Sequence, residues 1–283
     1  MTTFETPDPI TATLDLSVGG ARIIASNRED TLVEVRPSDP SKNDDIKAAE
    51  QTRIDYADGR LSVVAPKTWK RYSLFGHGGS IQVRIELPTG SRLRGDSGMG
   101  DFDTEGRLGD CRLKTSYGNI RLDETAALDA HSSYGDITVD LVGGDAQVST
   151  SSGDLRVREV KGAAQVKNSN GDCMVGEVTG EVRVKSSNGD ITIERAGGSV
   201  DAKTANGSIL VADASSGSVT LATACGDLEL GIREGTAAWL DVSSAYGDVR
   251  NSLTASDNPP TGDTVEVHAR TSYGDVVIRR SPA

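Results

Sequence analysis

Residues 115–120 read Thr-Ser-Tyr-Gly-Asn-Ile, and residues 132–137 read Ser-Ser-Tyr-Gly-Asp-Ile. The same phrase recurs along most of the chain: small polar residues, a variable one, Gly, a short polar residue and then an apolar one. Its glycines are Gly100, Gly118, Gly135, Gly153, Gly171, Gly189, Gly207, Gly226, Gly247 and Gly274. The intervals between them are 17 to 19 residues, except for the last two, which are 21 and 27. A fixed period of about 20 residues is typical of a solenoid, in which each repeat forms one coil.

Apolar residues occupy fixed positions around this glycine. In the copy at Gly189 they lie two and four residues after it, at Ile191 and Ile193, and five and seven residues before it, at Val184 and Val182. This alternation indicates half-buried strands. A second glycine column, nine residues before the motif, divides each repeat into two halves, each with one strand and one turn. The sequence therefore predicts an all-β parallel β-solenoid, or β-helix, with coils of about 18 residues and two strands.

Residues 1–95 do not follow the repeat, and we expect them to form an N-terminal β cap packed on the solenoid of residues 96–283 in a single continuous domain. Asp58-Gly59 predicts a hairpin turn. Residues 41–51 favour a helix, with Ser41 as its N-cap. Asn251–Thr264, which contains Pro259-Pro260, is expected to loop out. The predicted strands of the cap are Thr11–Val18, Ala21–Ala25, Thr31–Arg36, Arg53–Tyr56, Arg60–Val64 and Ile81–Leu87.

Composition excludes several classes of protein. The net charge is −12 and the basic residues are scattered, which argues against a nucleic-acid partner. Since no apolar run reaches 18 residues, we expect no membrane span. The first residues lack the charged and apolar regions of a secretory signal, and the three cysteines fall in different columns of the repeat. We therefore expect a cytoplasmic protein with reduced thiols.

The residue after the motif glycine is Asp in most copies, among them Asp136, Asp154, Asp172 and Asp190. Stacked carboxylates of this kind are a candidate calcium ladder, as in nonapeptide β-rolls. The other half of the repeat carries no matching Asp and no G-G-x-G-x-D phrase. The alternative is that each side chain hydrogen-bonds the backbone of its own turn, without any metal. We expect no other cofactor.

The residue before the motif glycine also forms a column. It is Asn at 170, 188 and 206, and Tyr at 117, 134, 246 and 273. Asn ladders stabilise stacked strands. Neighbouring tyrosines either stack for structural reasons or offer a platform for a sugar or a protein.

The segment from Trp69 to Gly79 is basic and aromatic in a chain that is acidic and only 4% aromatic. Its candidate partner-binding residues are Trp69, Arg71, Tyr72, Phe75 and His77. Such a composition is typical of an interaction hot spot. The alternative is that Trp69, Leu74 and Phe75 plug the end of the solenoid.

Three stretches together resemble a bacterial family of putative adhesins that is defined by a domain of unknown function. They are Ser187-Asn188-Gly189-Asp190-Ile191, Thr271-Ser272-Tyr273-Gly274-Asp275-Val276, and the block that ends with residues 85–90, Ile-Glu-Leu-Pro-Thr-Gly. The resemblance covers nearly the whole chain and implies a β-solenoid of bacterial origin. It supplies no catalytic residues.

We find no metalloprotease, nucleophile-elbow, P-loop or C-x-x-C phrase, so we expect no enzyme. The leading hypothesis is a non-enzymatic scaffold or protein-binding module with a protein partner. One alternative is a self-assembling filament of the cytoskeletal type, since self-association is possible for stacked coils. The other is a carbohydrate-binding or carbohydrate-active β-helix.

Overall fold

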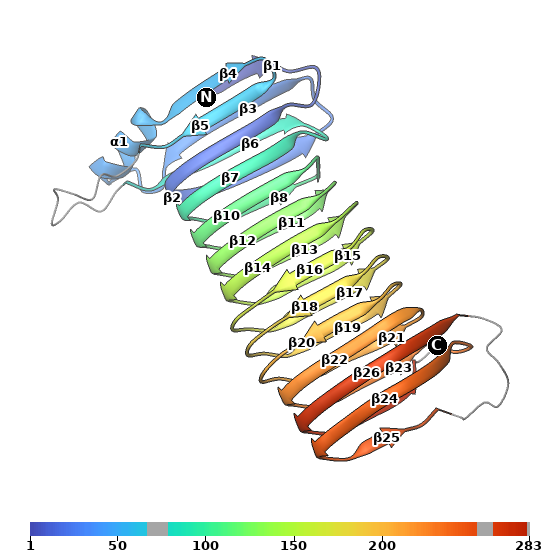
Figure 1. The fold of residues 1–283 in the computed structure, drawn as a ribbon. Helices are drawn as coiled ribbons and strands as arrows, with labels where there is room; N and C mark the ends of the chain where they lie inside the picture. Colours follow the sequence, from blue (N-terminus) through green and yellow to red (C-terminus); the bar gives the residue numbers. More distant parts are fainter. Residues whose placement is uncertain (67–78, 254–262, 282–283) are drawn as a thin grey trace. The chain divides into compact units, whose positions relative to one another are not determined.

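The structure, a computed structural model, describes residues 1–66, 79–253 and 263–281. They form 27 strands and one helix and divide into two units, Met1–Leu141 and Val142–Ala283. The repeat forms parallel coils in both units, as predicted, and the fold is a parallel β-solenoid (Figure 1). Within the described residues, no helix is long and apolar enough to cross a membrane.

The first unit stacks two-strand coils whose strands alternate between two sheets. In one sheet β7, β10 and β12 run parallel, so that Leu93, Cys111 and Leu128 are neighbours in register. Its strands are β1 (Thr2–Glu5), β2 (Thr11–Ser26), β3 (Asp30–Pro37), β4 (Arg53–Ala57), β5 (Arg60–Val64), β6 (Ile81–Pro88), β7 (Arg92–Met99), β8 (Phe102–Glu105), β9 (Arg107–Leu108), β10 (Cys111–Tyr117), β11 (Ile120–Thr125), β12 (Leu128–Tyr134) and β13 (Ile137–Val142).

Strand β2 is continuous over the two strands that the sequence predicts at Thr11–Val18 and Ala21–Ala25. Its first half pairs with β5 and β7 in one sheet, and its second half pairs with β6 and β8 in the other. It changes sheet at Gly19, which has a φ of +132°. Strand β2 thus forms a coil of its own that lies between β5–β6 and β7–β8, out of chain order.

The remaining N-terminal elements are antiparallel. Strands β1, β3 and β6 pair antiparallel, as do β4 and β5. The hairpin between β4 and β5 turns at Asp58 and Gly59, as predicted. The helix α1 spans Asn43–Gln51, but the prediction that Ser41 caps it is wrong. Lys42 is the N-cap residue and makes no side-chain cap bond, while the Ser41 hydroxyl donates to Asp39.

The second unit continues the same pattern of coils, and Figure 1 shows its strands β16, β18, β20 and β22 in succession. Val182 pairs with Val200, and Ile191 with Ile209, so like positions stack on like positions. Its strands are β14 (Ala146–Ser152), β15 (Leu155–Val160), β16 (Ala164–Lys167), β17 (Cys173–Val178), β18 (Val182–Lys185), β19 (Ile191–Ala196), β20 (Val200–Lys203), β21 (Ile209–Ala214), β22 (Gly217–Cys225), β23 (Leu228–Ile232), β24 (Ala237–Tyr246), β25 (Val249–Asn251), β26 (Thr264–Tyr273) and β27 (Val276–Arg280).

The last coils of the second unit do not follow chain order. Strand β26 pairs with β22 on one side and β24 on the other, and β27 pairs likewise with β23 and β25. The later strands β26 and β27 therefore lie inside the stack. The outermost described coil is formed by β24 and β25, which we call the end coil.

The motif glycines are required by the closeness of neighbouring coils. Gly189 has a φ of +126°, and a Cβ atom added to it would lie 2.2 Å from the carbonyl oxygen of Gly171. Gly171 meets Gly153 in the same way, at 2.3 Å. No side chain fits there, because real Cβ atoms do not approach backbone so closely and the left-handed region disfavours them as well.

We predict that Gly189→Ala lowers the free energy of unfolding by about 3 kcal/mol or more, because the new methyl group strains the backbone and forces two coils apart. The control is Gly59→Ala, at a hairpin glycine with a φ of +71° and open space around it. There only the conformational cost of about 1–2 kcal/mol applies. Chemical denaturation measures both. Equal losses would contradict the account of the motif glycines.

Candidate functional site

The partner-binding residues proposed from sequence, Trp69, Arg71, Tyr72, Phe75 and His77, lie outside the described residues. The described surfaces of the two units carry four other kinds of candidate: the side-chain columns of the repeat, the ion-pair clusters, the hollows and the outermost coil of the second unit, formed by β24 and β25.

The Asp column forms a ladder of hydrogen bonds between coils. In the first unit the backbone N–H of Asp136 donates to the side-chain oxygen of Asn119, at 2.9 Å. In the second unit the N–H of Asp172 donates to Asp154, and that of Asp190 to Asp172, at 3.1 and 2.9 Å. Each of these acceptor side chains thus takes a bond from the neighbouring coil, whereas the non-metal alternative expected a bond to its own turn.

The ladder uses one oxygen of each of these carboxylates as an acceptor of a backbone N–H. Asn119 does the same with an amide oxygen, so this bond needs no negative charge. Within the described residues, no group of three or more His, Cys, Asp or Glu side chains is placed to hold a metal ion. The hydrogen bonds explain the Asp column on structural grounds, since each one gives a backbone N–H at the turn an acceptor from the neighbouring coil.

The column before the motif glycine is a second ladder. Asn188 donates to Asn170, and Asn206 to Asn188, at 3.0 and 2.9 Å. The tyrosines stack in pairs, Tyr117 on Tyr134 and Tyr246 on Tyr273, each with ring centroids 4.9 Å apart. Because stacked rings cover one another's faces, an internal pair presents edges and not a flat platform to solvent.

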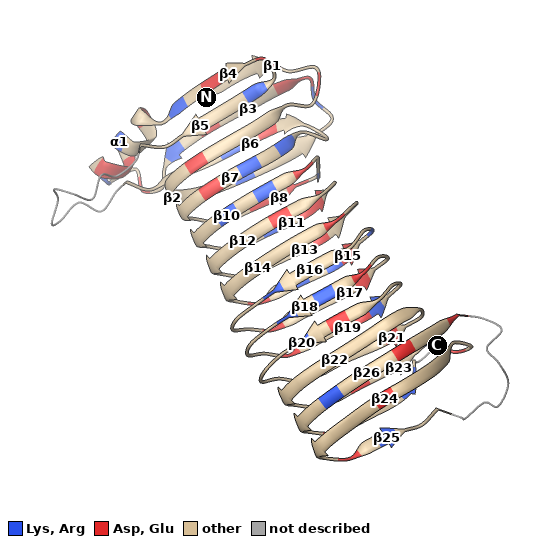
Figure 2. Ribbon diagram, in the orientation of Figure 1, with Lys and Arg blue, Asp and Glu red and all other residues tan. Residues whose placement is uncertain are grey.

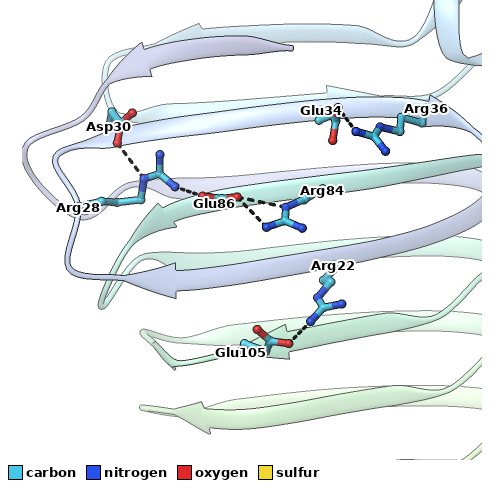
Figure 3. Close-up of polar contacts among 8 residues, drawn as sticks. All are labelled: Arg22, Arg28, Asp30, Glu34, Arg36, Arg84, Glu86 and Glu105. Atoms are coloured by element: carbon cyan, nitrogen blue, oxygen red, sulfur yellow. Dashed lines mark hydrogen bonds and ion pairs between the residues drawn. The ribbon is translucent and has the colours of Figure 1, made fainter.

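A cluster of ion pairs covers one face of the first unit (Figure 3). Arg28 contacts Asp30, at 2.8 Å, and Glu86, and Arg84 donates to Glu86 at 2.9 Å. Hydrogen bonds from Arg84 and Arg28 lower the pKa of Glu86, and the bond from Arg28 lowers the pKa of Asp30. Because these charges are paired with one another across β3 and β6, the cluster braces the fold and leaves little charge for a ligand.

Two hollows are also lined by paired charges. One, of about 400 Å³ in the first unit, contains Arg22, which is bound by Glu105. The other, of about 220 Å³ in the second unit, contains Arg195, which contacts Glu177 at 2.9 Å. Acidic and basic residues are likewise interspersed along the strands in Figure 2. Neither hollow presents an unpaired cation.

The end coil differs from the coils beneath it because its core is open. Val249 is 44% exposed, whereas Val276, its neighbour in register, is fully buried. Leu240 and Val242, whose counterparts in β26 are buried, are only half-buried. Asn251 stands where the neighbouring coil has Ile278. The end coil therefore exposes side chains at core positions, whereas the same positions are buried in the other described coils of the second unit.

An aromatic and charged cluster joins the end coil to the strand beneath it, with Trp239 and Asp241 on β24 and His268 and Arg270 on β26. Trp239 is 59% exposed, and its ring centroid lies 5.7 Å from that of His268. Asp241 accepts a bond from Arg270 at 2.9 Å and lies 3.4 Å from His268. These contacts, with Arg270 the stronger, lower the pKa of Asp241. Trp and Arg are enriched at the centres of protein interfaces.

Sequence reasoning missed this surface, although two signals pointed to it. Asn251 interrupts an aliphatic column, and the following interval of 27 residues breaks the period. Both indicate that the coil at Gly247 is not an interior one. The end coil, with Trp239, Tyr246 and Val249, is the candidate docking surface.

We predict that Asp190→Ala lowers the free energy of unfolding by about 1 kcal/mol, because the backbone N–H of Ser208 loses its acceptor. Asp190→Asn keeps an acceptor oxygen, as Asn119 does, and is expected to match the wild type with and without a chelator. Denaturation curves give both values. A chelator-sensitive wild type with an insensitive Asn variant would instead support the calcium ladder.

We also predict that one of the three thiols reacts rapidly with a thiol-specific chromogenic reagent. Burial raises the pKa of Cys111 to about 11 and that of Cys173 to about 12, so both are protonated at neutral pH. Cys225 is exposed. Rapid labelling should disappear in Cys225→Ser, and its persistence there would show that a buried cysteine is accessible.

Three solved structures resemble the chain at low identity. A putative adhesin from Bacteroides fragilis is 8% identical, with 98% of this chain and 95% of that chain covered and a TM-score of 0.39. A putative cell adhesion protein from Clostridium sporogenes is 11% identical, with 99% and 98% covered and a TM-score of 0.25. A putative adhesin from Parabacteroides distasonis is 12% identical, with 98% and 95% covered and a TM-score of 0.32. Likenesses this distant carry no argument about function.

No curated protein matches the chain. The model of one protein family does, and the match extends over residues 13–279. It thus includes the coils of both units and the end coil. The chain belongs to the Toastrack DUF4097 family.

Proposed function

We propose that the chain is a non-enzymatic protein-binding module that docks its partner on the end coil. The observation that carries the proposal is the exposure of core positions there, Val249 above all, beside the exposed rings of Trp239 and Tyr246. Apolar side chains gathered in this way mark interaction surfaces on soluble proteins.

The backbone of the end coil supports the same proposal. Among the described strands, β24 pairs only with β26, and β25 only with β27. Each therefore has a second edge whose N–H and C=O groups lack a strand partner in the described chain. An exposed edge accepts an added strand by β-augmentation, in which the main chain supplies affinity and the side chains supply specificity.

The cluster around Trp239 would provide that specificity. Arg270 and Asp241 hold opposite charges next to the indole ring, and His268 and Glu266 extend the polar rim, with 3.1 Å between their side chains. An apolar centre with a charged rim is the usual anatomy of a protein interface. The side chains of Asp241, His268 and Glu266 form hydrogen bonds and ion pairs within this surface cluster. Such an arrangement suits recognition of a partner better than catalysis.

A photo-cross-linking residue at Ser243 tests the proposal in the cells that produce the protein. Ser243 is exposed on β24, and Lys185 is exposed at the same repeat position on the interior strand β18. We expect protein adducts from position 243 but not from position 185, and fewer adducts when Trp239→Ala is added. Equal cross-linking from both positions, or none from 243, would overturn the proposal.

A further inference from the structure

We propose that the partner of the end coil is a second copy of the chain, bound through a two-fold axis that places β25 antiparallel to β25 of the copy, centred on Val249. The inference rests on the proposed function, because it names the occupant of that docking surface. The symmetry of the edge, the order of its charges and the elements that close the first unit support it.

Symmetry decides the strand direction. A two-fold axis pairs one surface with an identical surface and closes the assembly at two copies. If the axis runs perpendicular to both sheets, it places β24 of one copy beside β24 of the other, and β25 beside β25. Each strand then runs in the direction opposite to its copy. Both new strand pairs are then antiparallel, and antiparallel pairing satisfies the exposed backbone groups of both edges at once.

The charges of β25 and its preceding turn are self-complementary in that arrangement. Asp248 and Arg250 flank Val249, and their side chains are 77% and 65% exposed. In an antiparallel pair centred on Val249, residue 248 of each copy lies opposite residue 250 of the other. Two Asp–Arg pairs therefore form across the interface, and opposite charges in directly facing positions stabilise paired strands.

The apolar positions match in the same register. Val249 meets Val249 of the copy on the inner face of the sheet, where interior coils stack aliphatic residues such as Leu228 and Val276. Leu240 and Val242 from β24 lie on the same open core. The second copy thus supplies the layer of side chains that a further coil would have supplied.

The end of the aspartate ladder also faces this interface. The N–H of Asp248 donates to Asp275 at 2.9 Å, in the same way as Asp172 donates to Asp154 and Asp190 to Asp172. The Asp248 carboxylate is the last of the series and contacts Arg250 of its own coil at 3.4 Å, while Arg250 also lies 3.3 Å from Asp275. It can exchange this weak local contact for Arg250 of the copy without breaking the ladder.

Stacking onto the N-terminal elements of another copy is disfavoured by their structure. The outer strands of the first unit, β1 and β4, are antiparallel additions to β3 and β5, and Phe4 packs against Tyr56 with ring centroids 5.0 Å apart. The helix α1 contacts β3 and β6. These elements offer no open coil for a parallel end coil to continue.

Sedimentation of the purified full chain over a range of concentrations tests the proposal. We expect a monomer–dimer equilibrium with no larger species. Arg250→Asp and Asp248→Arg each place like charges opposite one another and should weaken dimerisation on the order of tenfold. The double variant Asp248→Arg/Arg250→Asp should restore the dimer, and an equimolar mixture of the two single variants should form a heterodimer.

The matched control is Arg156→Asp. Arg156 occupies the same repeat position in an interior coil and makes the same 3.4 Å contact with its Asp154. Its variant should dimerise like the wild type, and thermal melting checks the folding of every variant. The inference is overturned if the wild type stays monomeric or forms open-ended polymers, or if the double variant fails to restore the dimer.

The cross-linking experiment separates this inference from the proposed function. A monomer that still cross-links another protein from position 243 would overturn the inference alone, whereas a monomer without adducts would overturn the proposed function as well.

Discussion

The distance between neighbouring coils at their turns is the constraint on which each unit depends. Coils stacked at the spacing of paired strands, about 4.8 Å, bring the carbonyl oxygen of one turn against the α-carbon of the next. Only glycine fits there, as at Gly189, whose added Cβ would meet the oxygen of Gly171 at 2.2 Å. The following residue then has its N–H directed at the neighbouring coil, and an Asp or Asn side chain accepts it. The recurring phrase therefore encodes contact between coils.

The same constraint explains why the edges of the structure differ from its interior. An interior coil has a neighbour on both sides, whereas an outer coil does not. Strands β2, β26 and β27 have partners on both sides although they lie near the start and at the end of the described chain. This placement holds each of them with two sets of hydrogen bonds. In the second unit, β24 and β25 are the strands left without a second neighbour. Their core positions are therefore exposed and available for docking.

The sequence predicts the coil because each column is repeated many times, so that a departure in one copy does not hide the pattern. It does not predict the order of the coils at the ends. The turns at Gly247 and Gly274 carry nearly the same phrase, Ala-Tyr-Gly-Asp-Val and Ser-Tyr-Gly-Asp-Val, so the motif cannot tell which of the two lies outermost. The discriminating residue is Asn251, opposite Ile278. The cap of α1 was missed for a local reason, since Asp39 engages Ser41 and Asp45 receives the N–H of Asp39 instead.

Hydrogen exchange of the end coil would test the central claim, that this coil docks a second copy of the chain, most directly. The backbone amides of Ala237–Tyr246 would be followed in the purified chain at low and at high protein concentration, with Val182–Lys185 of the interior as an internal reference. The account predicts that protection of the end coil rises with concentration while that of the interior strand stays constant. Two results would contradict it. The end coil could already be as protected as the interior strand at low concentration, or its protection could stay the same as the concentration rises.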